Sequence, residues 1–125
     1  HTRLVLYKRI ASSRSADELR ELQVEMIDRF GLLPEQAGFL MGVTQLKLKA
    51  NPMGIIKLEA GPSGGRIVFQ GEPKIDPSHL IGLIQTRPQE FKLDGADKLR
   101  FFREMPDRSR RINQVSSLLD EISGR

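Results

Sequence analysis

The sequence predicts an α+β fold in which helices pack with short antiparallel β-hairpins, in the order ααα-ββ-α-ββ-α. Apolar residues recur at helical spacing through residues 4–48. Two pairs of short β-rich segments follow, and a glycine-containing turn joins each pair, which favours antiparallel hairpins. Helical and strand segments occur in separate runs, which favours α+β over a doubly wound sheet. A chain of 125 residues has the length of one domain, so we expect residues 1–125 to form a single domain.

The first predicted helix ends at residues 11–13 and has Lys8 and Arg9 on its solvent side. Its apolar positions are Leu4, Tyr7 and Ile10. The second helix begins at residues 15–18, where Ser15 and Glu18 have the spacing of a capping box. Its apolar stripe consists of Leu19, Leu22, Met26 and Phe30. Gly31 supplies the left-handed conformation that commonly ends a helix.

A third helix is predicted after Pro34, because proline suits a first helical turn, and it ends at residues 51–54. Its apolar side consists of Ala37, Leu40, Met41, Thr44 and Leu48. Residues 55–60 and 66–70 are expected to be strands. The sequence Asp76-Pro77 then provides a cap and a first-turn proline for a short helix. The apolar positions of this helix are Leu80, Ile81, Leu83 and Ile84.

A second hairpin is predicted over residues 91–102, with its turn at Asp94-Gly95. Because consecutive strand residues face alternately, Phe101 and Phe102 place one ring on each face of the sheet. The last helix follows Pro106. Its buried seam consists of Ile112, Val115, Leu119 and Ile122, with Leu118 beside it.

The composition bounds the class of protein. Cysteine is absent, which excludes disulfides and thiolate catalysis and fits a reducing compartment, so the predicted localisation is cytoplasmic. No apolar run approaches the length of a membrane span or forms a signal peptide, so we expect no membrane partner. The chain begins without methionine, and we expect it to be excised from a larger multidomain protein.

Motifs for catalysis are missing. The glycine cluster of residues 61–65 lacks the lysine of a phosphate-binding loop and leads into a strand, so it predicts a hairpin turn. The two histidines, His1 and His79, have no carboxylates at metal-site spacing, and we expect His79 to face solvent. No serine lies in a nucleophile elbow. The sequence therefore predicts a non-catalytic chain without a metal or cofactor.

The second helix carries a stripe of carboxylates. Residues 17–29 contain five acidic and two basic residues, and Glu18, Glu21, Glu25 and Asp28 fall beside the apolar stripe. The helix dipole stabilises acidic residues at the start of a helix. Glu25 and Asp28 lie near the end, where the dipole destabilises a negative charge, so some other charge has to compensate for them. The residues leave two interpretations equally open, which are a solvated face and a docking ridge.

Residues 98–111 carry the opposite charge, with six basic and two acidic residues. The basic group consists of Arg100, Arg103, Arg108, Arg110 and Arg111, interleaved with two phenylalanines. This composition is typical of single-strand nucleic-acid binding, which is our alternative function for the chain. The competing interpretation is that one ring is core and that the arginines pair within the chain or keep it soluble.

Several segments together carry a family resemblance. They are Arg3-Leu4, Tyr7–Ser12, Glu18-Leu19, Ile27–Pro34, Lys57–Glu59, Gly64-Gly65, Leu80–Gln85, Leu93–Gly95 and Leu99–Phe101. In this order and spacing the chain resembles the C-terminal domain of bacterial transcription-repair coupling factors (Mfd). The resemblance implies a parent that is an ATP-dependent, double-stranded DNA translocase of the helicase superfamily. Such a parent displaces stalled RNA polymerase and recruits UvrA for nucleotide excision repair.

The resemblance also implies a role for this domain. In that family the C-terminal domain docks on the N-terminal UvrB-like module and masks its UvrA-binding surface, so this chain would be autoinhibitory. Under this implication the docking interpretation is favoured, because carboxylates on a helix complement arginines on a partner. The predicted docking residues are Glu25 and Asp28, with Glu21 in support and Glu18 as a cap. We expect the isolated domain to be monomeric.

Overall fold

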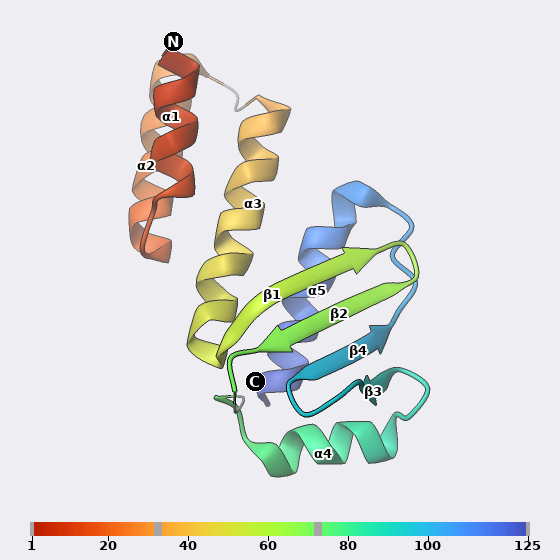
Figure 1. Cartoon of the computed structure of the whole chain (residues 1–125). Coiled ribbons are helices and arrows are strands. Elements are labelled where there is room, and N and C mark those ends of the chain that lie inside the picture. Colours follow the sequence, from red (N-terminus) through yellow and green to blue (C-terminus); the bar gives the residue numbers. More distant parts are fainter. Residues whose placement is uncertain (1, 32–33, 72–73, 125) are drawn as a thin grey trace. The chain divides into compact units, whose positions relative to one another are not determined.

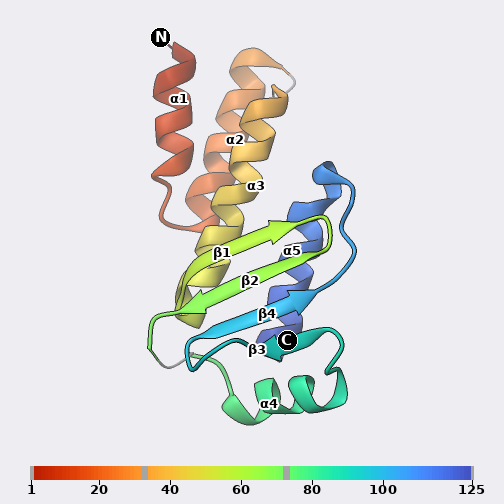
Figure 2. The same cartoon turned by 45° about the vertical axis from the view of Figure 1, so that its right-hand side comes forward.

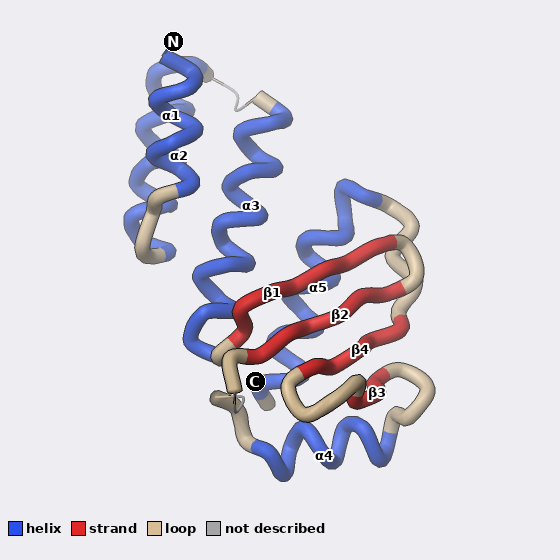
Figure 3. Tube along the Cα trace, in the orientation of Figure 1, coloured by secondary structure: helices blue, strands red, loops and turns tan. Residues whose placement is uncertain are grey.

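The computed structural model describes residues 2–31, 34–71 and 74–124, with side chains described from Leu4 onwards. The elements follow the order ααα-ββ-α-ββ-α, with one short 3₁₀ helix, η1 (Asn51–Met53), between the third helix and the first strand (Figures 1 and 3). The predicted α+β fold class is confirmed. The chain divides into two compact units, His1–Leu48 and Lys49–Arg125. The expectation that residues 1–125 act as one regulatory domain stays a prediction.

The N-terminal unit consists of α1 (Thr2–Ala11), α2 (Ala16–Phe30) and most of α3 (Glu35–Ala50). Its core contains Leu6, Ile10, Leu19, Leu22, Met26, Ala37 and Met41. Two positions of the predicted apolar faces, Leu4 and Phe30, are exposed. On α1 the core side is set by Leu6 and Ile10, four residues apart, and Leu4 lies about 200° around the helix from Leu6.

The predicted capping box of α2 is present, except that Glu18 accepts from the backbone N–H of Arg14 instead of that of Ser15. Ser15 Oγ accepts a hydrogen bond from the backbone N–H of Glu18 at 3.0 Å. The Glu18 carboxylate accepts from the backbone N–H of Arg14 at 3.1 Å, one residue before the cap. At the other end, the N–H of Gly31 donates to the carbonyl of Ile27 at 2.7 Å. Glu18 is therefore used within the chain, as its assignment to a cap requires.

The C-terminal unit is built on a four-stranded antiparallel sheet in the order β1-β2-β4-β3. The strands are β1 (Ile55–Gly61), β2 (Gly64–Phe69), β3 (Phe91–Leu93) and β4 (Lys98–Phe102). In this order β4 pairs with both β2 and β3, so it joins the two predicted hairpins. Helix α5 (Arg108–Ser123) covers one face of the sheet, and α4 (Pro77–Thr86) lies beside the β3 edge (Figures 1 and 2).

The two faces of the sheet differ in burial. Along β4, Leu99 and Phe101 are buried towards α5, whereas Arg100 and Phe102 are exposed, which confirms the prediction for the two rings. Gly65 lies opposite Phe101 in the neighbouring strand. A Cβ atom there would be 2.7 Å from the Phe101 ring and 1.9 Å from the Glu59 carbonyl oxygen, so the close approach requires glycine.

The two helices of this unit mostly follow the predicted burial. In α4, Leu80 and Leu83 are buried, but Ile81 is half exposed. In α5, three of the four predicted seam residues and the neighbouring Leu118 are buried, and Ile112, the first seam residue, is only partly buried. The buried residues of α5 are Val115, Leu118, Leu119 and Ile122. Ile81 of α4 and Ile112 of α5 therefore lie at the edge of the core.

Candidate docking surface on helix α2

Helix α2 buries one side in the N-terminal core and presents the opposite side to solvent. At about 100° per residue, Glu21, Val24, Glu25 and Asp28 lie within roughly 100° of one another on that solvent side. We call these four residues the α2 face. Glu21, Val24 and Asp28 are exposed and Glu25 is partly buried, and the exposed Ile27 borders them. The α2 face therefore combines carboxylates with apolar surface.

Glu25 is the carboxylate of the α2 face that pairs within the chain. Its Oε2 lies 2.6 Å from a guanidinium nitrogen of Arg9, and the two side chains are 42% and 49% exposed, respectively. The pair borders a shallow hollow of about 250 Å³, which Glu21 also lines. Arg9 is thus the offsetting charge that Glu25 requires near the end of α2. A half-exposed pair of this kind contributes between about 0 and 1 kcal/mol to stability.

Asp28 and Glu21 have a different environment. Among the residues that the structure describes, neither carboxylate forms a hydrogen bond or an ion pair. Asp28 lies in the last turn of α2, where the helix dipole opposes a negative charge. Its charge is therefore available to a cation outside the described part of the chain.

The five arginines of the predicted basic group do not form one surface. Arg111 donates two hydrogen bonds to the Met105 carbonyl, at 3.0 and 2.9 Å. Arg110 pairs with Asp107 at 3.6 Å, and Arg108 is exposed in the first turn of α5. Arg103 is in an internal ion-pair cluster. Arg100 is on the sheet face opposite α5, with its guanidinium carbon 5.8 Å from the centroid of the Phe102 ring.

The ion-pair cluster around Arg103 is a feature that the sequence did not predict. It consists of Arg87, Glu90, Arg103 and Glu121, and we call it the charged clamp. Glu121 lies 2.9 Å from a nitrogen of Arg87 and 2.9 Å from a nitrogen of Arg103. Glu90 accepts from the Nε of Arg103 at 2.9 Å and pairs with Arg87 at 3.3 Å. The clamp connects the end of α4, the start of β3, the end of β4 and α5.

The clamp shifts the pKa of three of its side chains, Glu121, Arg87 and Arg103. Partial burial opposes the charged form of Glu121, but hydrogen bonds from Arg103 and Arg87 outweigh it and hold the pKa of that carboxyl below its ordinary value of 4.5. The same hydrogen bonds keep the arginines charged against the effect of burial on Arg103, and they raise the pKa of both guanidinium groups. Glu121, Arg87 and Arg103 therefore stay charged at neutral pH.

His79 also belongs to this end of the unit. Its Nε2 is 2.6 Å from the Glu121 carbonyl oxygen, and its ring packs over Gly124, so the predicted solvent-facing position is wrong. The Glu121 carbonyl lies in the last turn of α5 and also accepts a hydrogen bond from the N–H of Gly124 at 3.3 Å. His79 of α4 reaches this carbonyl because α4 packs against α5. Its role here is to connect two helices.

In the described ranges, no three His, Asp or Glu side chains are grouped closely enough to bind a metal ion. The helices of these same ranges are each too short or too polar to traverse a bilayer.

Comparisons with known proteins are consistent with one family. Residues 1–80 match the family described as the TRCF domain. The chain is similar to the transcription-repair-coupling factor of Escherichia coli (strain K12), with 43% identity over 122 residues, which cover 98% of this chain and 11% of that protein. The corresponding factor of Haemophilus influenzae is 40% identical over 121 residues, covering 97% of this chain and again 11% of the relative. The chain thus spans about a tenth of the length of these relatives.

A solved structure gives independent support for the fold. The crystal structure described as the C-terminal domain of transcription-repair coupling factor superposes on this chain with a TM-score of 0.71. The match covers 98% of this chain and 81% of that chain, at 19% sequence identity. At this identity the likeness shows the shared fold.

Proposed function

We propose, from the premise that this chain belongs to the TRCF-domain family of transcription-repair coupling factors, that it is a non-catalytic regulatory domain. In this proposal the chain docks on the UvrB-like module of its parent protein and masks the UvrA-binding surface of that module. The parent is an ATP-dependent DNA translocase in the cytoplasm, where it displaces stalled RNA polymerase and recruits nucleotide excision repair. The masking contact is autoinhibitory.

The observation that carries this proposal is the state of Asp28 and Glu21. Both carboxylates are exposed, and neither has a partner among the described residues. Val24 and Ile27 are exposed beside them. Carboxylates orient a contact with a cationic surface, and adjacent apolar side chains supply surface to bury. The α2 face thus has both elements of a modest interface with an arginine-bearing partner.

Regulation by masking requires a contact of limited strength. A closed form favoured by about 3 kcal/mol leaves less than about 1% of the parent open. UvrA, or engagement of the motor with DNA and polymerase, then opens the protein by binding the open form preferentially. A docking face with few charged contacts fits this requirement, whereas a large apolar interface would hold the domain closed.

The test is UvrA binding by the full-length parent. Replacing the docking carboxylates, Glu25→Ala with Asp28→Ala, is expected to weaken masking and to raise the apparent affinity for UvrA about ten-fold, which corresponds to a loss of about 1.4 kcal/mol of masking energy. Of the two single variants, Asp28→Ala should account for the larger share, because Glu25 already pairs with Arg9. Binding is measured by titration with labelled UvrA.

A charge-matched control separates docking from a general change in charge. Asp94→Ala with Glu104→Ala removes two exposed carboxylates that belong to the C-terminal unit and not to α2. This variant should bind UvrA like the wild type. If the docking variant remains folded by circular dichroism and its UvrA affinity does not change, docking through the α2 face is wrong. The same conclusion follows if the control variant gains affinity equally.

A further inference from the structure

The face of the sheet opposite α5 carries an ordered row of charges. Strand pairing places Arg66 opposite Glu59 on one side and opposite Arg100 on the other, and Lys92 opposite Arg100. Because directly paired residues point to the same side, Glu59, Arg66, Arg100 and Lys92 form one line across all four strands. Lys57, Lys98 and Phe102 alternate onto this side as well. We call these seven residues the outer sheet face.

Positive charge is in excess on the outer sheet face. Glu59 lies 2.9 Å from Lys57 and 3.3 Å from Arg66, and hydrogen bonds from these two side chains lower the pKa of its carboxyl. Lys92, Lys98 and Arg100 have no carboxylate partner in the part of the chain that the structure describes. Lys92 and Arg100 lie about 5 Å apart across β3 and β4, and Lys98 lies two residues from Arg100 along β4. These cations complement a chain of regularly spaced anions.

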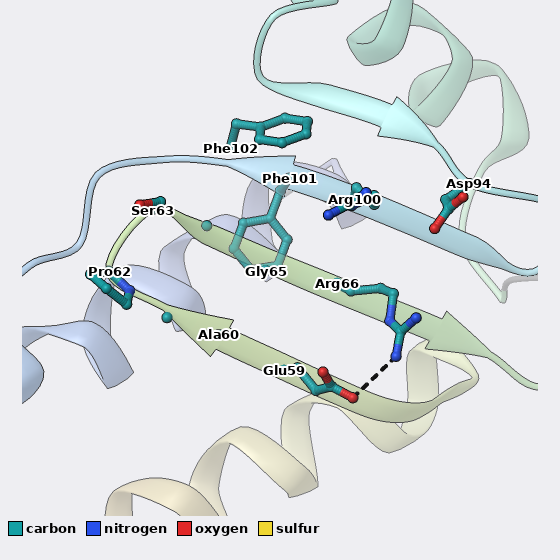
Figure 4. Close-up of a pocket in the computed structure, with 12 residues that line it drawn as sticks. Glu59, Ala60, Pro62, Ser63, Gly65, Arg66, Asp94, Arg100, Phe101 and Phe102 are labelled. Atoms are coloured by element: carbon teal, nitrogen blue, oxygen red, sulfur yellow. Dashed lines mark hydrogen bonds and ion pairs between the residues drawn. The ribbon is translucent and has the colours of Figure 1, made fainter.

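A hollow of about 690 Å³ opens beside this row (Figure 4). Residues 59–66 and residues 100–102 line it, together with Asp94. Three glycines of the β1–β2 hairpin are part of this lining, and at Gly64 and Gly65 the Cβ position is filled by the neighbouring strands. At Gly61 only the Gly64 carbonyl oxygen lies near that position, at 3.9 Å, so a flat group can approach the backbone there. At its border the Phe102 ring is 45% exposed, with the Arg100 guanidinium 5.8 Å from its centroid.

We infer that the outer sheet face binds a single strand of nucleic acid. Arg66, Arg100 and Lys92 contact successive phosphates, and a base stacks on Phe102 over the glycine-lined hollow. An acidic peptide would pair with the cations, but it would make no use of the exposed Phe102 ring or of the hollow beside it. Duplex DNA is read by an element that enters a groove, and the outer sheet face offers a surface without such a projection. This inference uses a different unit from the α2 face and does not depend on the proposed docking.

The test is fluorescence anisotropy of the 125-residue chain with a labelled oligothymidylate at several salt concentrations. In a single strand each neutralised phosphate contributes about 0.7 to the log–log salt slope, so Arg66→Ala with Arg100→Ala should lower the slope by about 1.4. Phe102→Ala should weaken binding at least about five-fold and leave the slope unchanged, because stacking releases no counterions. Phe102 is exposed, so its variant is expected to remain folded.

The matched control is Arg20→Ala with Arg29→Ala, which removes the same charge from exposed positions of α2. It should keep both the affinity and the salt slope of the wild type. The inference is overturned if the wild type does not bind at low salt, or if the control loses as much affinity as the variant of Arg66 and Arg100. It is also overturned if polyglutamate of equal charge competes as well as unlabelled oligothymidylate, since the face would then recognise charge alone.

Discussion

The charged clamp of the C-terminal unit and the α2 face of the N-terminal unit use carboxylates in opposite ways. In the clamp, Glu90 and Glu121 are only 23% and 34% exposed, and two arginines contact each of them. On the α2 face, Glu25 has a single half-exposed partner, and Asp28 has none among the described residues. The carboxylates of the clamp thus differ from those of the α2 face in the number of their cationic partners and in their burial.

Burial and the number of cationic partners determine whether a carboxylate can bind another molecule. A partly buried carboxylate between two cations stabilises the fold around it, and its removal leaves those cations without their partner. An exposed carboxylate with one partner or none contributes little to stability and can pair with another molecule at small cost. The net charge of a sequence segment does not distinguish these cases, because both units contain similar side chains.

The largest expected effect is on the clamp. Glu121→Ala should lower the free energy of unfolding by about 2 kcal/mol, because it removes charged hydrogen bonds to Arg87 and Arg103 and leaves Arg103 partly buried with half of its partners. Urea denaturation followed by circular dichroism measures the change as a lower midpoint with an unchanged slope.

Glu104→Ala is the control for this substitution. Glu104 follows Arg103 in the sequence and is exposed, so its removal should change the unfolding free energy by less than about 0.5 kcal/mol. If the two substitutions destabilise the chain equally, the clamp does not differ from a set of surface charges. The carboxylates of the two units would then not differ in their contribution to stability.

A smaller effect is expected from pH. Because the folded pKa of Glu121 lies below its ordinary value of 4.5, its stabilising contribution is complete above that value. The contribution is lost as pH falls below 4.5 and through the lowered folded pKa. The difference in unfolding free energy between wild type and Glu121→Gln should therefore be constant near neutral pH and should shrink in acid. Urea titrations at a series of pH values measure it, and a difference that grows in acid would contradict the pairing.

The local features of the fold were predictable from the sequence. Ser15, Gly31, Pro34 and the turn at Asp94-Gly95 each act on neighbouring backbone, so their effects follow from sequence spacing alone. The order of helices and strands was predicted correctly for this reason. The alternation that separates Phe101 from Phe102 is equally local, because it depends only on the pleat of one strand.

Most charge partners of the clamp were not predictable, because all except Arg87 and Glu90 are distant in sequence. Glu121 meets Arg87 and Arg103 only after α4, β4 and α5 have packed, and no spacing in the chain indicates that meeting. The same packing gives His79 a carbonyl partner. The acidic stripe of α2 was predicted by its spacing, but the Arg9 partner of Glu25 comes from α1. Which residues dock on a partner stays a prediction.

The smallest expected effect concerns Glu25. Its pair with Arg9 is about half exposed, so Glu25→Ala should lower the unfolding free energy by no more than about 0.5 kcal/mol. A double-mutant cycle with Arg9→Ala isolates the pair, and the coupling should lie between about 0.2 and 1 kcal/mol and decrease at high salt. A coupling above about 1.5 kcal/mol that salt does not reduce would make Glu25 a structural residue like those of the clamp. Glu25 would then not be available for docking, and Asp28 and Glu21 would remain as the available charges of the α2 face.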